Sequence, residues 1–89
     1  MYLMHYLYVI MSDRDRKFYI GVTSDLAKRI NEHNTGKFKA WTNNRKWKLV
    51  YCEAYLNRRY PEKRERIIKR SGSVRTHLIK RIKESLIAW

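Results

Sequence analysis

Residues 4–23 read MHYLYVIMSDRDRKFYIGVT, two apolar stretches separated by a short polar one. From Met4 to Met11 apolar residues stand at odd and even positions alike, which is typical of a central strand covered on both faces. Residues 17–23 are again strand-like, and the polar residues 12–16 between the two stretches predict a turn. The segment therefore predicts a β-hairpin.

The residues that follow the hairpin predict a helix and then a strand. Ser24 and Asp25 supply a helix start, because their side chains can accept hydrogen bonds from its first free N–H groups. Gly36 is well placed to cap the other end of this helix. A basic, polar loop over residues 37–46 leads to a third predicted strand over residues 47–55.

Two further helices complete the predicted fold. The first begins at Asn57 or Tyr60 and has Pro61 in its first turn, where a missing N–H costs little. A break at residues 71–73 separates it from a last helix over residues 74–89, in which apolar residues recur every four positions along one face. The order ββαβαα predicts a small α+β domain with three strands able to pair antiparallel and three helices.

The composition fits one small, reduced domain. Of the 89 residues, 44% are apolar and 13% are aromatic, which suffices for a core and excludes simple disorder. We expect a single domain over residues 1–89. The longest apolar run, Tyr6 to Met11, is too short to span a bilayer, and the lone Cys52 cannot form an internal disulfide. We therefore expect a cytoplasmic protein that does not associate with membranes.

Positive charge is concentrated in the second part of the chain. The formal net charge is +13: residues 1–36 hold five basic and four acidic groups, whereas residues 37–89 hold sixteen and four. Such an excess causes self-repulsion unless the partner is a polyanion, and nucleic acid is the leading candidate. An anionic membrane surface and a merely solubilising surface are the alternatives. The candidate nucleic-acid contacts are Lys37, Lys39, Arg45, Lys46, Arg58 and Arg59.

Two tyrosines of the hairpin form the first candidate pair. If the turn is centred on Asp13 and Arg14, Tyr8 lies opposite Tyr19 and both phenols project from one face of the sheet. A slip of one residue would place them on opposite faces. The alternative is that both are packing residues. Gly21, two residues after Tyr19, is typical of a close backbone approach.

Arg29 and His33 are four residues apart, so they share one face of the first predicted helix. Two neighbouring cations repel each other unless both reach for one anion, and a phosphate suits both side chains. A solvated helix face is the alternative interpretation of the pair.

Glu65 stands in the heavily basic segment 62–70. A salt bridge along the helix is one explanation for a carboxylate at this position. The other is a divalent cation, because Mg²⁺ often takes only one or two protein carboxylates and leaves its other sites to water and substrate phosphate. The positions of the His and Cys residues do not resemble a zinc site.

These residues together resemble a known family. Residues 6–8 (Tyr-Leu-Tyr) and residues 19–21 (Tyr-Ile-Gly) resemble the two motifs of the GIY-YIG nucleases. Arg29 and His33 follow at the spacing of the family's first helix, and Glu65 stands where the family carries its metal-binding glutamate. The resemblance covers nearly the whole chain. It looks most like the small stand-alone bacterial members, which are related to the N-terminal nuclease domain of the excision-repair endonuclease.

The resemblance implies a three-stranded antiparallel sheet flanked by helices and an endonuclease that hydrolyses phosphodiester bonds in DNA with one divalent cation, Mg²⁺ or Mn²⁺. It implies that Tyr8 is the general base, that Tyr19 orients water or phosphate, and that Arg29 stabilises charge on the phosphoryl oxygens. It also implies that His33 assists the phosphate or Tyr8, and that Glu65 ligates the metal. A free phenol has a pKa near ~10, and Arg29 and the metal would favour the phenolate of Tyr8.

Departures from the family pattern leave a second interpretation open. Tyr6 and Leu7 replace the Gly and Ile of the first motif, and no Asn follows Glu65, although many members carry a late active-site Asn. The alternative is a non-catalytic nucleic-acid-binding module on the same fold. An RNA-binding protein is a third interpretation, with stacking surfaces supplied by Trp41, Trp47 and Tyr60.

In the nuclease interpretation the partner is DNA, in particular the damaged, branched or flapped structures that repair enzymes meet. We expect a monomer or a weak dimer that requires no small-molecule cofactor beyond the metal.

Overall fold

The computed structural model describes residues 3–35 and 46–87 of the chain. These residues form the predicted ββαβαα order, an α+β fold. The elements are β1 (His5–Ser12), β2 (Phe18–Thr23), α1 (Leu26–Asn34), β3 (Trp47–Tyr55), α3 (Arg59–Arg70) and α4 (Gly72–Ile87). None of the helices within the described ranges is long and apolar enough to cross a membrane.

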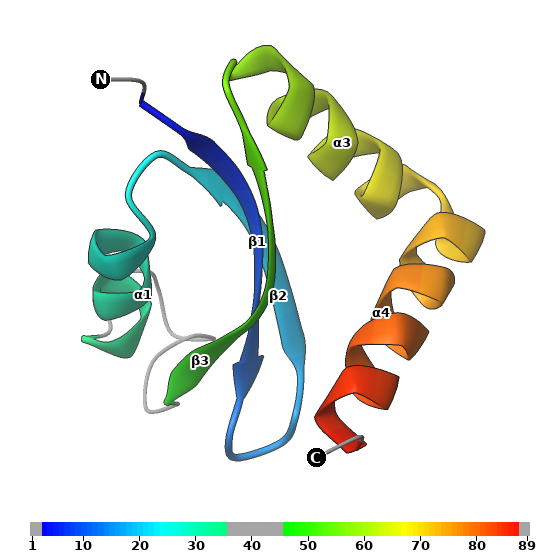
Figure 1. Ribbon diagram of the computed structural model, residues 1–89. Coiled ribbons are helices and arrows are strands. Elements are labelled where there is room, and N and C mark those ends of the chain that lie inside the picture. The colour runs from blue at the N-terminus through cyan, green and yellow to red at the C-terminus, as the bar shows by residue number, and fades with distance from the viewer. Residues whose placement is uncertain (1–2, 36–45, 88–89) are drawn as a thin grey trace.

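The three strands form one antiparallel sheet in the order β2-β1-β3, so the predicted central strand is indeed the central one. Helix α1 covers one face of this sheet, whereas α3 and α4 follow each other along the opposite face (Figure 1). The apolar residues of β1 at odd and even positions are buried because each face of the strand has its own helical cover.

The hairpin register differs from the predicted one. Tyr8 lies opposite Gly21, and Tyr19 lies opposite Ile10, so the prediction that the two tyrosines face each other directly is wrong. Each residue of β1 pairs two positions later on β2 than predicted, so the centre of the turn moves by one residue. The turn has Arg16 in a left-handed conformation (φ 56°) and is closed by the Ser12 N–H, which donates to the Lys17 carbonyl. A shift of two residues preserves the alternation of side chains, and Tyr8 and Tyr19 therefore still share one face.

The face under α3 and α4 carries a layer whose buried members are aliphatic, with Phe18 and Tyr51 packed against it. Its fully or almost fully buried members are Leu7, Val9, Ile20, Ile68, Leu78 and Ile82. The last two belong to the four-residue repeat that predicts the last helix, and that repeat does pack against the sheet. Burial of one such side chain stabilises the fold by roughly 1.5–3 kcal/mol.

The face under α1 is aromatic and partly polar. Tyr8, Ile10 and Trp47 are buried there, and Leu26 and Ile30 of α1 pack against them. Among the polar groups on this side, the imidazole of His33 is only 1% exposed. The two faces of one small sheet therefore have different chemistry.

One helix end agrees with the sequence prediction and one differs from it. Helix α1 begins as predicted, with the Asp25 carboxylate accepting from the Lys28 N–H at 3.1 Å; its C-cap residue is Thr35, and Gly36, the predicted capping glycine, lies outside the described residues. Helix α4 begins at Gly72 and not at Val74, so the predicted break shrinks to Ser71. The Ser71 hydroxyl accepts from the Val74 N–H at 3.4 Å, which allows the helix to start directly after it.

Candidate active site

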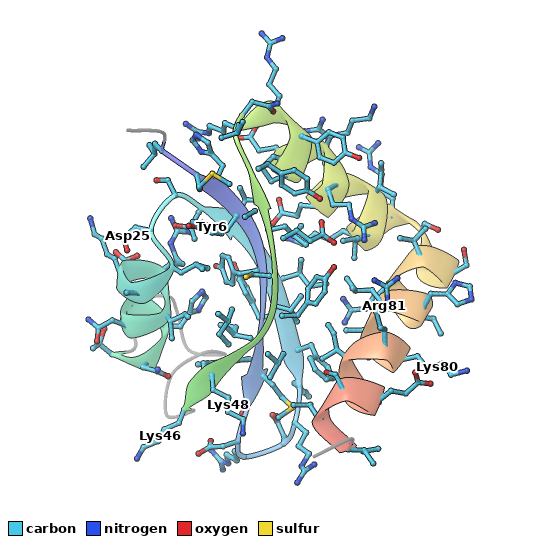
Figure 2. The ribbon with its side chains drawn as sticks, viewed as in Figure 1. Tyr6, Asp25, Lys46, Lys48, Lys80 and Arg81 are labelled. Carbon is cyan, nitrogen blue, oxygen red and sulfur yellow. The ribbon has the colours of Figure 1, made fainter. Side chains whose placement is uncertain are left out.

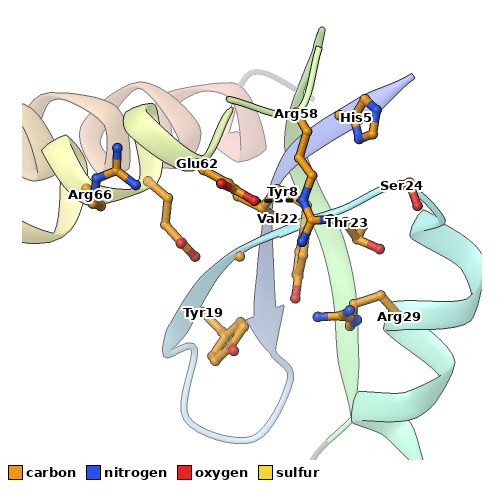
Figure 3. A pocket seen from close by; sticks show the side chains of 12 residues that line it. His5, Tyr8, Tyr19, Val22, Thr23, Ser24, Arg29, Arg58, Glu62 and Arg66 are labelled. Atoms are coloured by element: carbon orange, nitrogen blue, oxygen red, sulfur yellow. Dashed lines mark hydrogen bonds and ion pairs between the residues drawn. The ribbon is translucent and has the colours of Figure 1, made fainter. Parts of the chain in front are cut away.

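A hollow of about 470 Å³ lies between α1 and the first half of α3, over the end of the hairpin. Four of the five predicted catalytic residues line it, each from a different element: Tyr8 of β1, Tyr19 of β2, Arg29 of α1 and Glu65 of α3. Figure 3 shows Arg29 pointing from α1 toward Tyr8, with Glu62 on the opposite side. The fold therefore brings together side chains that are up to 57 residues apart in the chain.

The Tyr8 side chain is buried, and its ring forms part of the floor of the hollow. The absence of a side chain at Gly21 leaves the space that this ring occupies. The ring of Tyr8 lies directly over its cross-strand partner Gly21: a Cβ atom there would be 2.5 Å from Tyr8 Cζ and 2.8 Å from Cε1. A side chain at position 21 is therefore incompatible with the present position of the phenol. The predicted close backbone approach is confirmed at this glycine.

His33 lies in the core beneath the hollow and not in its lining. Its Nε2 atom is 3.1 Å from the Tyr8 hydroxyl, and its ring centroid is 4.6 Å from that of Tyr19. Burial and the neighbouring Arg29 lower the pKa of His33, so the imidazole is neutral at neutral pH. The structure thus brings His33 to Tyr8, whereas Arg29 faces the hollow.

The Tyr8 hydroxyl keeps its proton at neutral pH in the protein alone. Burial raises its pKa well above the ordinary value, Tyr19 raises it further, and the guanidinium of Arg29 offsets only part of the rise. Arg29 lowers the pKa of Tyr8, as expected, but desolvation raises this pKa by more than Arg29 lowers it. A neutral imidazole within hydrogen-bond distance is then the group able to accept the phenol's proton.

Arg29 is half-exposed, and its Nε atom is 3.3 Å from Glu32 Oε1 on the same helix. Arg29 and Glu32 are about one helical turn apart on α1, and their ion pair still allows Arg29 to line the hollow. An Arg at such a site can bind phosphoryl oxygens with two parallel hydrogen bonds.

Glu65 forms the predicted salt bridge, and its carboxylate also lies in the wall of the hollow. The Glu65 Oε2 atom accepts from Lys69 Nζ at 3.2 Å along the helix. Glu62 lines the hollow one turn earlier and pairs with Arg58 at 2.7 Å.

These two carboxylates are the groups that could hold a metal. No group of three or more His, Cys, Asp or Glu side chains suited to a metal occurs among residues 3–35 and 46–87. Mg²⁺ does not need one, because it commonly binds one or two carboxylates and completes its shell with water and phosphate. Glu65, with Glu62 beside it, fits that chemistry.

The helix that carries Glu65 is fixed to the sheet by a polar cluster which the sequence did not reveal. Glu53 of β3 accepts hydrogen bonds from Arg64 at 3.1 Å and from the hydroxyls of Tyr51 and Tyr55 at 2.6 Å each. Burial by itself would raise the pKa of Glu53, but these hydrogen bonds lower it overall, so Glu53 stays ionised at neutral pH. Since Arg64 precedes Glu65, this cluster sets the position of the candidate metal ligand.

The predicted nucleic-acid contacts separate into groups. Lys37, Lys39 and Arg45 lie outside the described residues. Lys46 precedes β3 and lies at its start (Figure 2), whereas Arg58 and Arg59 follow its far end, about 30 Å away for a strand of this length. Only Arg58 of the described candidates lines the hollow.

Other residues that line the hollow are not among the predicted catalytic or nucleic-acid-binding residues. They are His5, Gly21, Val22, Thr23, Ser24, Glu62 and Arg66. A helical repeat could have indicated part of this set, since Arg58, Glu62 and Arg66 follow one another at four-residue steps along one face of α3.

Comparison with known proteins agrees with this geometry. The GIY-YIG catalytic domain matches residues 4–76. The chain belongs to the GIY-YIG family. A UPF0213 protein of Clostridium perfringens is 40% identical over 68 residues, which cover 75% of this chain and 72% of the relative. Another, of Haloquadratum walsbyi, is 35% identical over 66 residues, 73% of each chain.

A solved structure shares the fold. The solution NMR structure of the UPF0213 protein BH0048 from Bacillus halodurans superposes with a TM-score of 0.54 at 28% sequence identity, and the match covers 86% of this chain and 83% of that one. The family resemblance read from the tyrosine motifs is therefore confirmed, and it supports a nuclease-type function.

Proposed function

We propose that this protein is a divalent-metal-dependent endonuclease that hydrolyses phosphodiester bonds in DNA. One observation carries the proposal: a buried phenol, that of Tyr8, lines one hollow together with Arg29 and Glu65, which come from two other elements of the fold. A purely binding surface has no use for a buried phenol surrounded in this way. We take residues 1–89 as one nuclease domain.

Tyr8 and His33 act together on the attacking water in this proposal. Because the pKa of Tyr8 is raised, the phenol accepts a proton from water only as its own proton passes to His33 Nε2, 3.1 Å away. The lowered pKa of His33 keeps the imidazole neutral and ready to accept. The water oxygen then attacks phosphorus, the bond to the leaving oxygen breaks, and that oxygen takes up a proton from solvent water.

Arg29, on the α1 side of the hollow, and Glu65, on its α3 side, act on the phosphate in this proposal. Arg29 stabilises the charge that develops on the phosphoryl oxygens, and Tyr19 orients the phosphate or the water. Glu65 would hold Mg²⁺ or Mn²⁺, which supplies Lewis-acid polarisation of the phosphate when bound. Residues 37–89 hold sixteen basic and four acidic groups, and contacts of such groups with phosphates do not depend on base sequence. We therefore propose that the substrate is recognised by its shape, and that it belongs to the damaged, branched or flapped DNAs handled in repair.

The experiment compares Glu65→Gln with the matched variant Glu84→Gln. Both substitutions remove one negative charge from an exposed or half-exposed helical position, but Glu84 is on α4, away from the hollow. Cleavage of single-stranded, duplex, flapped and branched DNAs is measured with Mg²⁺, with Mn²⁺ and with EDTA. We expect Glu65→Gln to lose metal-dependent cleavage while it binds DNA as well as before, and Glu84→Gln to cleave normally.

Two results would count against the proposal. Normal Mg²⁺-dependent cleavage by folded Glu65→Gln would remove Glu65 as the ligand, and Glu62 would be tested next. Binding of all these DNAs by the unaltered protein without cleavage of any would assign it instead to the non-catalytic nucleic-acid-binding modules.

A further inference from the structure

Two further hollows adjoin the hollow of the candidate site. One, of about 450 Å³, lies at the α3–α4 junction, and Arg66 lines both it and the candidate site. The other, of about 170 Å³, lies at the start of α1 and shares Thr23, Ser24 and Arg29 with the candidate site. A strand of nucleic acid held at the site could leave it by either route.

The two routes differ in charge. The hollow at the start of α1 is lined by two carboxylates, Asp25 and Glu32, and by two cations, Lys28 and Arg29, so its formal charge is zero. The hollow at the α3–α4 junction is lined by three cations and no carboxylate. A polyanion is attracted to the second route and gains nothing from the first.

The cations at the junction are available to a ligand. Lys63, Arg66 and Arg70 form no ion pair with any residue in the described ranges, whereas Arg58 and Lys69 on the same helix are paired with glutamates. Their positions recur at three- and four-residue steps, so they form one stripe on α3. With a rise of 1.5 Å per residue the stripe is about 10 Å long, which matches on the order of three nucleotides of a strand.

An apolar side chain lies among these cations. Ile67 is 42% exposed and lines the junction hollow between Lys63 and Arg70. A sugar or base can contact such a side chain while the neighbouring cations bind phosphates. The surface thus combines the two kinds of group that a nucleic-acid strand presents.

We propose that the DNA strand bound in the site continues over the α3–α4 junction, along a junction track formed by Lys63, Arg66, Ile67 and Arg70, and not over the start of α1. The inference rests on the proposed function and deepens it: substrate is held mainly from one side of the scissile bond.

The test removes two cations from the track and two from elsewhere. The track variant is Lys63→Gln with Arg70→Gln, and the matched variant is Lys80→Gln with Lys83→Gln. All four residues are exposed, and Lys80 projects from the middle of α4, beyond the junction (Figure 2). Circular dichroism confirms the helices of both, and anisotropy of a fluorescent DNA in EDTA, titrated at several salt concentrations, gives Kd without cleavage.

We expect the track variant to bind roughly tenfold more weakly and its log–log salt slope to fall by about two, one for each lost phosphate contact. The matched variant keeps its slope, and the exchange Lys63→Arg with Arg70→Lys keeps the affinity. Equal losses in the track and matched variants would overturn the proposal, because the cations would then act only through the overall field.

Binding of anionic phospholipid vesicles that is lost in the track variant, with DNA affinity unchanged, would overturn it as well. These outcomes are independent of cleavage. Absence of cleavage by the unaltered protein refutes the proposed function. The DNA affinities of the track and matched variants still show whether DNA follows the junction track.

Discussion

The two faces of the sheet divide stability and chemistry between them. Strand β1 sends Leu7 and Val9 to the aliphatic layer under α3 and α4, and Tyr8 and Ile10 to the aromatic layer under α1. The fully buried side chains of the aliphatic layer are hydrocarbon, so their burial desolvates no polar side-chain group. The aromatic layer buries a phenol and an imidazole whose pKa values are displaced because burial disfavours their charged forms.

Helix α3 connects the two layers. Ile68 extends into the aliphatic layer, while Glu65, one turn earlier on α3, lines the hollow. The comparison therefore predicts that substitutions in the aliphatic layer change stability and leave the chemistry of folded molecules intact, whereas substitutions around the aromatic layer change the chemistry and, where they alter a buried group, stability as well.

The largest expected effect is on stability, from Ile68→Ala. Ile68 is completely buried, so its truncation removes apolar contacts and leaves a cavity at a cost of about 4 kcal/mol in the free energy of unfolding. Urea denaturation measures it. The matched variant is Ile67→Ala, a half-exposed neighbour, for which a loss below about 1 kcal/mol is expected. Similar losses in the two variants would contradict the assignment of the aliphatic layer as the main source of stability.

The next effect concerns rate. Arg29→Ala should raise the activation free energy of cleavage by about 3 kcal/mol, on the order of a hundredfold in rate, because it removes a transition-state contact. Stability and DNA affinity should hardly change, since an ion pair within one helix whose Arg29 side is open to solvent contributes little.

Lys28→Ala is the charge-matched control for Arg29→Ala, because it removes a cation from the adjacent position of α1. Single-turnover cleavage and binding are measured for both variants. If both variants lost binding and cleavage by one small factor, Arg29 would be a surface charge and nothing more.

Gly21→Ala should affect both properties, because Gly21 lies beneath the phenol of Tyr8. The added Cβ would overlap the buried ring, and such overpacking costs about 2 kcal/mol. Cleavage should fall as well, since Tyr8 must move away from its present position. The matched variant Gly72→Ala adds a methyl group where nothing lies within 4 Å, so its stability should be unchanged or slightly higher. Thermal unfolding of both variants, with cleavage at one temperature, distinguishes the two sites.

Much of this fold follows from local patterns in the sequence. The continuous apolar residues of β1 indicate a strand covered twice, and the bounds of β3 are those predicted. The hairpin register does not follow, because alternation determines which face a residue occupies but not which residue it opposes. The register depends on the turn, in which Arg16 adopts a left-handed conformation. Because this conformation is uncommon for residues other than glycine, the sequence does not indicate it at position 16.

The candidate site shows the same limit. Tyr19, Arg29 and Glu65 could be predicted as residues of the site because their order and spacing resemble those of the GIY-YIG family, whereas helical and strand periodicities alone left packing or solvent exposure open for each. The ion pair of Arg64 with Glu53 and the extension of the hollow to Arg66 depend on how α3 lies against β3. Such contacts join distant parts of the chain, and no local pattern specifies them.

The smallest expected effect is a pH dependence of stability that originates in the aromatic layer. The His33 imidazole packs against Tyr8, Tyr19 and Trp47 and has Arg29 and Glu32 nearby on its own helix. Because its pKa is lowered in the folded protein, the unfolded chain binds the proton more readily. Stability is therefore fully present above the ordinary value of 6.5 and is lost as pH falls below it through the lowered value.

Chemical denaturation at intervals between about pH 8 and about pH 5 measures this loss. Glu53, whose pKa is also lowered, contributes a loss only below its ordinary value of 4.5, outside this window. We expect His33→Gln to be less stable at the upper end but to show a flatter pH dependence, because no buried imidazole remains to be protonated. The control His77→Gln changes an exposed histidine of α4 and should keep the slope. An unchanged slope in His33→Gln would show that the imidazole is not held neutral by its buried position, and the proton relay from Tyr8 would lose its acceptor.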